Sequence, residues 1–472
     1  MPNQPVNQYR RDYIKLYPNG NYSPTGLYGT NTAKFFDIKN LVTDITITES
    51  LHQSSLMCTM NVLDGLNMLE DLQLEGNEFI EMQLSKKVPE GKFREAGRVK
   101  YKHTFVISDI VNYVRPKPGV QTYQLICISE HAYMNQLMRL NRKFEGNIGK
   151  LIQDIVFSDL EQHNNIGKIS RSAQSIKGIY PSLRPIDAIR WLTRNAIDDG
   201  HPFYFYETLK HRNNNTLNGK IFFKSLKEMA DEEIAADYEH KPFYDNINTT
   251  EEQDIKEQRK KILSISTPIE SSMFGQLKKG AFGSTLSSID IATKTVKTDE
   301  KYKYDDQFVL GDNRFRPFKK EKKFLEKAIN EFPFAKSYYA SLNTLAFDGF
   351  KNYHDATSEN IQNASSKMAC MEVSQININV CGDPRVSAGS KVRLKIPKSK
   401  DADLKGLSRG FVDDNKSGVY IVYDITHTFN FDQEYNMTLL CKKDTSRLDY
   451  DKEVGAWEKT IILVNSSLGI QV

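Results

Sequence analysis

One stretch of this chain occurs twice, and it limits the fold more than any other feature. The first copy is FVISDIVNYVRPKPGVQTYQLICI at 105–128, and the second is YIVYDITHTFNFDQEYNMTLL at 420–440. In each copy an apolar, β-rich run reaches an Asp-Ile pair, at Asp109 and at Asp424, then passes a polar turn and returns as a second apolar run. Turn residues between two such runs predict a hairpin. We therefore expect one β-hairpin that the chain uses twice.

The repetition continues upstream of each hairpin. MNVLDG at 60–65 matches INVCGD at 378–383, and EGNEFIEMQL at 75–84 resembles AGSKVRLKI at 388–396. Aligned by their letters, YQLIC at 123–127 corresponds to YNMTL at 435–439, so the copies differ by an insertion in the turn. A hairpin tip tolerates added residues at little cost. The sequence thus predicts a whole β-module that is duplicated.

Length and composition set the class of protein. A chain of 472 residues is too long for one core, so several domains are expected. Hydrophobic residues make up 39% and charged residues 26%, which is typical of a globular chain and not of a disordered one. The net charge is only +4, from 64 basic and 60 acidic residues. This balance argues against a dedicated nucleic-acid binder, and no nucleic-acid site is predicted.

The cysteines and the N-terminus bear on location. The five cysteines form no CxxC pair and are odd in number, which favours free thiols in a reducing compartment; they are Cys58, Cys127, Cys370, Cys381 and Cys441. The opening MPNQPVNQYRRDY lacks the apolar core of a signal peptide. No window reaches the roughly 18 apolar residues of a membrane span. We expect no stable membrane insertion.

The pattern along the chain predicts an α+β fold that is mainly β, with two similar small antiparallel β-barrel modules and a mixed helical and β insert between them. The expected segments are an N-terminal extended arm at 1–35, a first barrel at 36–135, a helical or mixed insert at 136–260, a β segment with connecting helices at 261–365, a second barrel at 366–445 and a C-terminal tail at 446–472.

Local patterns support this division. Apolar residues at helical spacing predict a helix over 148–160, Pro185 is a favourable first residue for another, and Lys319–Phe332 is expected to be a third. Phe203–Tyr206 and Lys220–Lys224 are expected to pair as a hairpin. The highly charged 230–261 segment is expected to be a solvated loop or helix.

No motif of an enzyme or of a metal site occurs. The nine histidines form no HExxH or HxH pattern, and GxSxG, P-loop and GxGxxG motifs are missing. The adjacent acids at 198–199, 305–306 and 413–414 are read as solvated loop acids, because neighbouring side chains point in different directions. We therefore predict no catalytic residue, no cofactor and no metal, and hence no enzyme.

Asp109 and Asp424 remain the most notable polar residues, since the repeat places an acid at the same point twice. They can be interpreted as a paired carboxylate site, or as acids that accept hydrogen bonds from a neighbouring loop or a partner subunit. The second interpretation is favoured, because a catalytic dyad requires both copies to face one cleft. The run Lys319–Lys323 is read as an exposed helix face, with a subunit contact as the alternative.

A duplicated module without catalytic motifs suggests that the chain builds symmetry. Two similar modules in each subunit allow a trimer to present six quasi-equivalent surfaces. Such a trimer would adapt a threefold object to a sixfold one.

At this point the chain resembles the baseplate central hub proteins of contractile-tailed phages, which are related to the hub part of VgrG. The resemblance rests on the order barrel, insert, barrel, on the matching strands FVISDIVNYV and YIVYDITHTF, and on two insert segments. These segments are RPIDAIRWLTRNAIDDGHPFYFYE at 184–207 and GAFGSTLSSIDIATK at 280–294. The similarity covers most of 36–445.

The resemblance implies a structural virion protein of the tail baseplate, assembled in the host bacterial cytoplasm. It implies a homotrimeric ring around a central channel for DNA, with tail-tube or tube-initiator proteins on one side and a central spike on the other. Baseplate wedge proteins are further expected partners. The barrels would be tube-like domains whose strands pair around the ring, which satisfies edges that otherwise promote aggregation.

The ring is expected to contain 56–63, 105–114, 121–128, 376–381, 420–429 and 435–441. The residues expected on its inter-subunit strands are Phe105, Ile107, Asp109, Tyr123, Leu125, Tyr420, Val422, Asp424, Tyr435 and Met437.

Residues 446–472 are too few for a fused β-helical needle or a muramidase domain, so a separate spike protein is expected, with 451–472 as its docking segment. Two alternatives stay open. One is a secretion-system or tailocin hub of the same fold. The other, from a different class, is a ligand-binding or hydrolytic protein with duplicated β-domains. A monomer with ligand affinity would favour this second alternative.

Overall fold

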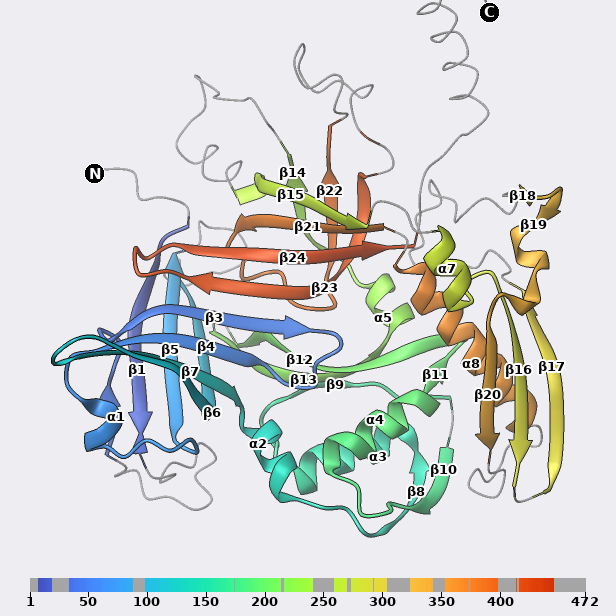
Figure 1. The fold of residues 1–472 in the computed structure, drawn as a ribbon, viewed down its shortest axis with the longest axis horizontal. Coiled ribbons are helices and arrows are strands. Elements are labelled where there is room, and N and C mark those ends of the chain that lie inside the picture. Colours follow the sequence, from blue (N-terminus) through green and yellow to red (C-terminus); the bar gives the residue numbers. More distant parts are fainter. Residues whose placement is uncertain are drawn as a thin grey trace, which may run out of the picture.

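The computed structural model describes residues 7–18, 34–87, 98–173, 175–213, 216–240, 259–269, 273–291, 293–303, 323–342, 353–372, 374–397, 413 and 416–444. The fold is α+β and mainly β, as predicted: strands form one large sheet and three small ones, and most helices lie in the insert (Figure 1). Within these residues no helix is both long enough and apolar enough to cross a membrane.

The first β-module is a sheet in which five strands pair antiparallel in the order β3-β4-β7-β6-β5. Their bounds are β3 Val42–Ser50, β4 Met57–Asp64, β7 Val120–Ser129, β6 Arg98–Lys117 and β5 Phe79–Lys87. Side chains alternate along each strand, so that Tyr123, Leu125 and Cys127 of β7 point into the core while their neighbours lie at the surface. The N-terminal strand β1 (Tyr9–Tyr17) extends this sheet beyond β5 and also pairs with the short β2 (Phe36–Asp37).

The second β-module repeats this arrangement. Its strands pair antiparallel in the order β15-β21-β24-β23-β22, and β14 adds to β22 in parallel. The bounds are β15 Ile262–Ile269, β21 Ser374–Cys381, β24 Tyr435–Lys443, β23 Gly418–Phe429, β22 Lys391–Lys395 and β14 Ile234–Glu239. A glycine with positive φ precedes the equivalent strands β5 and β22, Gly76 at 96° and Gly389 at 81°.

Neither module closes into the expected barrel through a strand ladder, as far as the described residues go. The guanidinium of Arg11 on β1 donates to the carbonyls of Val42 and Thr43, and a single bridge joins Glu239 to Lys261. In the first module the reason is that β3 pairs with β4 along one edge and with β23 of the second module along the other. The modules are therefore open sheets joined to each other.

The insert packs its own core beside the sheets. The helices predicted at 148–160 and from Pro185 are present, as α3 (Ile148–Asp154) with a following π-helical turn (Ile155–Asp159), and as α4 (Pro185–Asn195). The predicted hairpin is also present and is longer than expected. The remaining elements are α2 Glu130–Leu137, β8 Lys143–Asn147, β9 Ile166–Ile169, β10 Ser175–Ile179, β11 Ile197–Asp198, β12 His201–Asn213, β13 Thr216–Ser225 and α5 Leu226–Asp231.

Beyond the insert, a three-stranded sheet packs against α8 (Tyr353–Cys370) in the order β17-β16-β20, with α7 (Met273–Lys279) beside the helix. The strands are β16 Gly283–Asp290, β17 Thr295–Lys303 and β20 Ser337–Leu342.

Two local predictions were wrong. In place of a helix at Lys319–Phe332, the described residues from 323 form β18 (Lys323–Phe324), β19 (Lys327–Ala328) and a 3-10 turn, because Leu325 and Glu326 adopt positive φ and reverse the chain. Residues 319–322 of that charged run lie outside the described part. In 230–261, a loop or helix was expected, but Ile234–Glu239 form the strand β14, since Ala236 and Tyr238 alternate into the core; residues 241–258 of that segment lie outside the described part.

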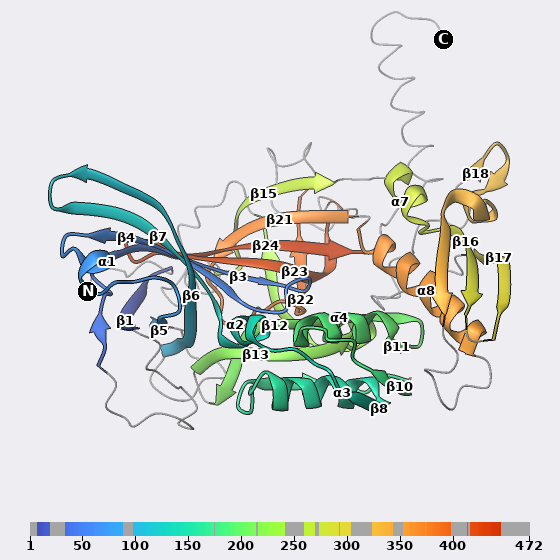
Figure 2. The ribbon, with the colours of Figure 1, turned by 60° about the horizontal axis from the view of Figure 1, so that its bottom comes forward.

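The two β-modules share one core. A single cluster of buried apolar side chains runs from β1 through both modules, for example Ile14, Ile47, Phe105, Phe429 and Leu439. The tips of the β6–β7 and β23–β24 hairpins lie on the same side of the molecule, and the three-stranded sheet lies at the opposite end (Figures 1 and 2). The predicted arm is described from 7 to 18 and again from 34, and the tail at 446–472 lies outside the described residues.

Candidate functional site: the joint between the two repeated sheets

The hydrogen-bond registers show that the repeat includes a β-bulge. Between β6 and β7, Ile107 lies opposite Cys127 and Asp109 opposite Ile126, so Ser108 is the extra residue. Between β23 and β24, Val422 lies opposite Cys441 and Asp424 opposite Leu440, so Tyr423 is the extra residue. A bulge locally increases the twist and re-aims the strand. Asp109 and Asp424 therefore occupy equivalent places immediately after equivalent bulges.

The same registers change the alignment of the return strands. Because Cys127 and Cys441 are equivalent, Tyr123 corresponds to Met437, two residues away from the Tyr435 that the letters suggest. A shift by two keeps every side chain on its face of the sheet, so apolar alternation cannot detect it. Upstream, Cys58 and Ile376 lie opposite the two cysteines, which agrees with the predicted match of MNVLDG to INVCGD.

The length difference between the copies lies in the strands as well as in the turn. The first hairpin continues until Lys117 lies opposite Val120, with a further bulge near Asn112, whereas the second stops where Phe429 lies opposite Tyr435. The added residues of the first copy therefore lengthen its edge.

The long strand of each module, β6 or β23, pairs with its hairpin partner along one edge, and its other edge is divided at the bulge. β5 covers β6 as far as Val106, and β22 covers β23 as far as the equivalent residue Ile421. Past the bulge, β23 pairs antiparallel with β3, from Asp424 opposite Ser50 to Phe429 opposite Ile45. We call this β3–β23 pairing the internal joint. On β6 the corresponding edge, 109–117, has no strand partner within the described residues.

Burial differs accordingly. In the internal joint Ile425 and Phe429 are fully buried and Asp424 is half-buried. On the first module Asp109 is exposed, and Tyr113 and Val114 are 45% and 55% exposed. The same kind of strand is thus covered in one copy and open in the other.

A buried carboxylate holds the internal joint. Glu49 of β3 is 1% exposed and accepts hydrogen bonds from the hydroxyl of Thr208, from the backbone N–H of Leu209 at 3.0 Å and from that of Ala388 at 2.9 Å. His427 Nε2 lies 3.0 Å from Glu49 Oε1. These groups come from β12, from the loop before β22 and from β23. A buried carboxylate with its acceptor sites filled in this way fixes the relative position of all these elements.

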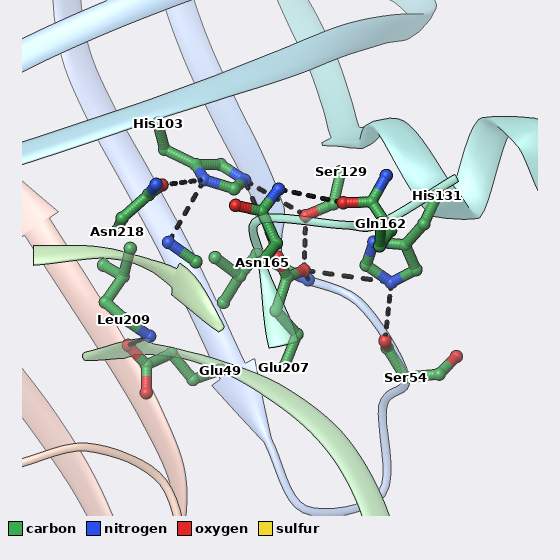
Figure 3. A network of polar contacts seen from close by, with 12 residues as sticks. Glu49, Ser54, His103, Ser129, His131, Gln162, Asn165, Glu207, Leu209 and Asn218 are labelled. Carbon is green, nitrogen blue, oxygen red and sulfur yellow. Dashed lines mark hydrogen bonds and ion pairs between the residues drawn. The ribbon is translucent and has the colours of Figure 1, made fainter. Parts of the chain in front are cut away.

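A second buried carboxylate attaches the insert to the first module (Figure 3). Glu207 of β12 accepts from the backbone N–H of Leu56 at 2.8 Å and from the hydroxyl of Ser129 at 2.5 Å. His103 Nε2 lies 3.9 Å and His131 Nε2 4.0 Å from its carboxylate oxygens, and His131 Nε2 also donates to the Ser54 carbonyl at 2.8 Å. Burial lowers the pKa of His103 and outweighs the opposing influence of Glu207. Burial therefore favours the neutral form of His103 in the folded chain.

Two further contacts tie the modules together. The backbone N–H of Tyr9 donates to the carbonyl of Gln433, and the backbone N–H of Tyr435 donates to the carbonyl of Asn7. These two bonds attach the start of β1 to the second hairpin. Lys86 of β5 is fully buried, donates to the Gly382 carbonyl and lies 5.1 Å over the Tyr435 ring. Burial, together with the nearby Arg259, lowers the pKa of Lys86 to about 8.

The ten residues predicted for inter-subunit strands all lie on β6, β7, β23 and β24. Eight have side chains in the core, with at most 3% exposure: Phe105, Ile107, Tyr123, Leu125, Tyr420, Val422, Tyr435 and Met437. Only Asp109 and Asp424 reach the strand surface. The internal joint brings Asp424 to Ser50, not to Asp109. That these strands meet another subunit stays a prediction.

Sequence reasoning missed Glu49, Glu207, His103, His131 and His427. One signal was available: Glu49 follows Ile45 and Ile47 at strand spacing, which places an acid on the inward face. No group of three or more potential metal-binding side chains occurs within the described residues.

Comparison with known proteins gave structural matches alone. No protein-family profile and no curated protein matches the sequence. The structure is similar to a tail protein from Neisseria meningitidis, with 9% identity, 93% of this chain and 97% of the other covered, and a TM-score of 0.46. It is similar to a prophage tail protein from Shewanella oneidensis, with 12% identity, coverages of 92% and 98%, and a TM-score of 0.44.

A third similar structure is a chain of the Francisella PdpA–VgrG complex, with 10% identity and a TM-score of 0.45. The match covers 93% of this chain and 59% of that one. The similar structures are phage tail and VgrG-type proteins, the classes that the sequence resemblance named.

Proposed function

We propose that this chain is the central hub of a contractile-tail baseplate. Three copies form a pseudo-sixfold ring that adapts the sixfold tail tube to a threefold central spike. The observation that supports this best is the pair of sheets with one strand order, joined edge to edge by β3 and β23. A chain that already holds two neighbouring modules of a ring requires three copies for six modules.

The distribution of elements in the chain suits the two symmetries. The β-module occurs twice per chain, so a trimer presents six similar surfaces on the side where both hairpin tips lie (Figure 2). The insert with α3 and α4 and the three-stranded sheet with α8 occur once per chain among the described residues, so a trimer presents three of each. Closed rings of this kind arise from one heterologous contact that repeats until it closes.

The proposed partners follow from this geometry. Tail-tube or tube-initiator proteins would dock on the sixfold side and a trimeric spike on the threefold side, with baseplate wedge proteins at the rim. The proposed location is the baseplate of a virion tail, and the role is structural, without catalysis. A secretion-system or tailocin hub needs the same ring, and similarity to a VgrG chain keeps that candidate beside the virion one.

Electron microscopy of the purified chain, alone and co-expressed with a spike protein encoded beside it, tests the proposal. We expect ring-shaped particles with six lobes and a central opening in at least the co-expressed sample. Single elongated particles in both samples would contradict the hub. Such particles combined with saturable ligand binding would favour the ligand-binding or hydrolytic alternative.

A further inference from the structure

We infer that the open edge of β6, residues 109–117, pairs antiparallel with the outer edge of β15 from a second copy of this chain. This inference rests on the proposed ring and names the surface that closes it. It is drawn from the internal joint, in which the same chain already makes the equivalent pairing between its own modules.

β15 is the equivalent of β3. β3 lies beside β4, with Ile45 opposite Met60, and β15 lies beside β21, with Ile265 opposite Ile378. In the two modules, Cys58 lies opposite Cys127 and Ile376 lies opposite the equivalent Cys441. Met60 and Ile378 each follow by two residues, so they are equivalent in the repeat. β3 is covered on its outer edge by β23. Among the described residues, no strand ladder covers the outer edge of β15, and a single bridge joins Lys261, directly before the strand, to Glu239 at the end of β14.

The equivalences fix a register for the joint between copies. Thr48 lies opposite Met57, and Ile269 lies opposite Gln375, which is the equivalent of Met57. Ile269 therefore corresponds to Thr48, which faces Thr426 in the internal joint. Since Thr426 corresponds to Val111, the register sets Val111 opposite Ile269 of the next copy.

The lengths of the two edges agree with this register. Counting antiparallel from Val111 and Ile269 brings Lys117, the last residue of β6, close to Leu263 near the start of β15. The extended first hairpin thus supplies an edge that runs along all of β15. A bulge between Ser266 and Ile269 contains Pro268, which lacks a backbone N–H and is typical of an edge strand.

The surfaces have the chemistry of an interface between copies. Leu263 is 50% exposed on β15, and Tyr113 and Val114 are similarly open on β6. The sequence also repeats at this point: Glu49-Ser50 follows Thr48, and Glu270-Ser271 follows Ile269. Ser50 donates to Asp424 in the internal joint, and Asp109 is the equivalent of Asp424. A second copy of the same sequence is therefore the occupant that fits both edges.

Thiol crosslinking tests the register with a matched control. In the Val111→Cys/Ile269→Cys variant, a short bismaleimide is expected to join different chains and to give covalent dimers and trimers on a denaturing gel. In the Thr48→Cys/Thr426→Cys variant, which places cysteines at the equivalent positions of the internal joint, the crosslink forms within one chain. The five native cysteines are buried, so they compete little for the reagent.

A second pair of variants does not depend on crosslinking. Leu263→Lys places a charge on the proposed joint, and we expect the trimer dissociation constant to rise at least about tenfold. Phe431→Lys alters a residue on the second hairpin tip, outside the joint, that is 66% exposed against 50% for Leu263, and it is expected to leave the dissociation constant within about twofold.

The outcomes separate this inference from the proposed function. A wild-type trimer that gives no 111–269 product, or that is unaffected by Leu263→Lys, overturns the joint and leaves the ring intact. A monomeric wild-type chain, alone and with the spike, overturns the ring and the joint with it.

Discussion

The hydroxyl of Ser50 donates a hydrogen bond to the carboxylate of Asp424, which is 374 residues away in the sequence. This contact lies directly after the repeated bulge and at the first residue pair of the internal joint. It gives the second acid of the repeat a structural role: Asp424 receives a donor from the neighbouring sheet. Asp109 occupies the same position on an edge that is open in the single chain.

Asp424→Ala and Asp109→Ala form a matched pair of variants. Asp424→Ala should lower the free energy of unfolding by about 1–2 kcal/mol, because Ser50 loses a charged acceptor at the joint. Asp109→Ala should change it by less than about 0.5 kcal/mol in a monomeric sample, since Asp109 is exposed. Urea denaturation of dilute samples measures both. Equal losses of unfolding free energy in the two variants would contradict this account, in which Asp424 accepts a stabilising hydrogen bond and Asp109 lies on an open edge.

Glu49→Ala should be among the most damaging single substitutions. It removes the acceptor of Thr208, Leu209, Ala388 and His427 together, and buried donors are left without a partner. We expect a loss of about 3 kcal/mol in the free energy of unfolding. Glu70→Ala, which removes an exposed ion pair with Arg115, should cost less than about 1 kcal/mol. A tolerated Glu49→Ala would show that the joint does not depend on this carboxylate.

Lys86→Met should stabilise the protein at neutral pH. The folded-state pKa of Lys86 is lowered from 10.5 to about 8, so at pH 7 the folded chain holds a buried ammonium that is better solvated when unfolded. Removing it should add about 2 kcal/mol. Between pH 8 and 10.5 the folded lysine loses its proton while the unfolded one keeps it, so wild-type stability rises with pH and the advantage of Met shrinks.

Parallel denaturation of wild type, Lys86→Met and the exposed control Lys100→Met at pH 7 and pH 9 checks this sign. Lys100→Met should behave as wild type at both pH values. An advantage of Lys86→Met that grows at pH 9 would contradict the account.

His103 should contribute to acid sensitivity. Its pKa is lowered by burial, so the unfolded chain takes up a proton more readily as the pH falls below about 6.5. Stability from His103 is therefore present above that pH and is lost on acidification. The groups that face it are Glu207, whose charge opposes the effect, and His131, Asn218 and Ser129.

His103→Gln should thus show a smaller fall in unfolding free energy between pH 7 and pH 5.5 than wild type. The exposed His163 provides the control, since His163→Gln should leave the pH dependence unchanged. An unchanged slope in His103→Gln would show that another group governs the acid sensitivity.

The duplication and the main elements were predictable from the sequence because they depend on local patterns. Alternation in 121–129 and helical spacing from Ile148 indicate which face is buried, and both predictions agree with the structure. The registers were not predictable: a shift of two residues at Tyr123 preserves the pattern of side-chain faces. The helix expected at Lys319–Phe332 was wrong because its spacing of apolar residues does not reveal the positive φ of Leu325 and Glu326.

The joint could be predicted only in part. The repeated Asp was visible, and its interpretation as an acceptor for a neighbouring segment agrees with the Ser50 contact. Which segment approaches it is a tertiary fact, because Ser50 and Asp424 are brought together by two sheets that the sequence does not place. The buried histidines were invisible for a similar reason: His103 and His427 acquire their role from Glu207 and Glu49 on other strands.

The solution mass of the purified chain, measured by light scattering alone and with a co-expressed spike protein, tests the central claim most directly. The account predicts a mass of three times 54.2 kDa for this chain in at least one of the two samples. A mass of one chain under both conditions, over a range of concentrations, would contradict the ring and the function proposed for it.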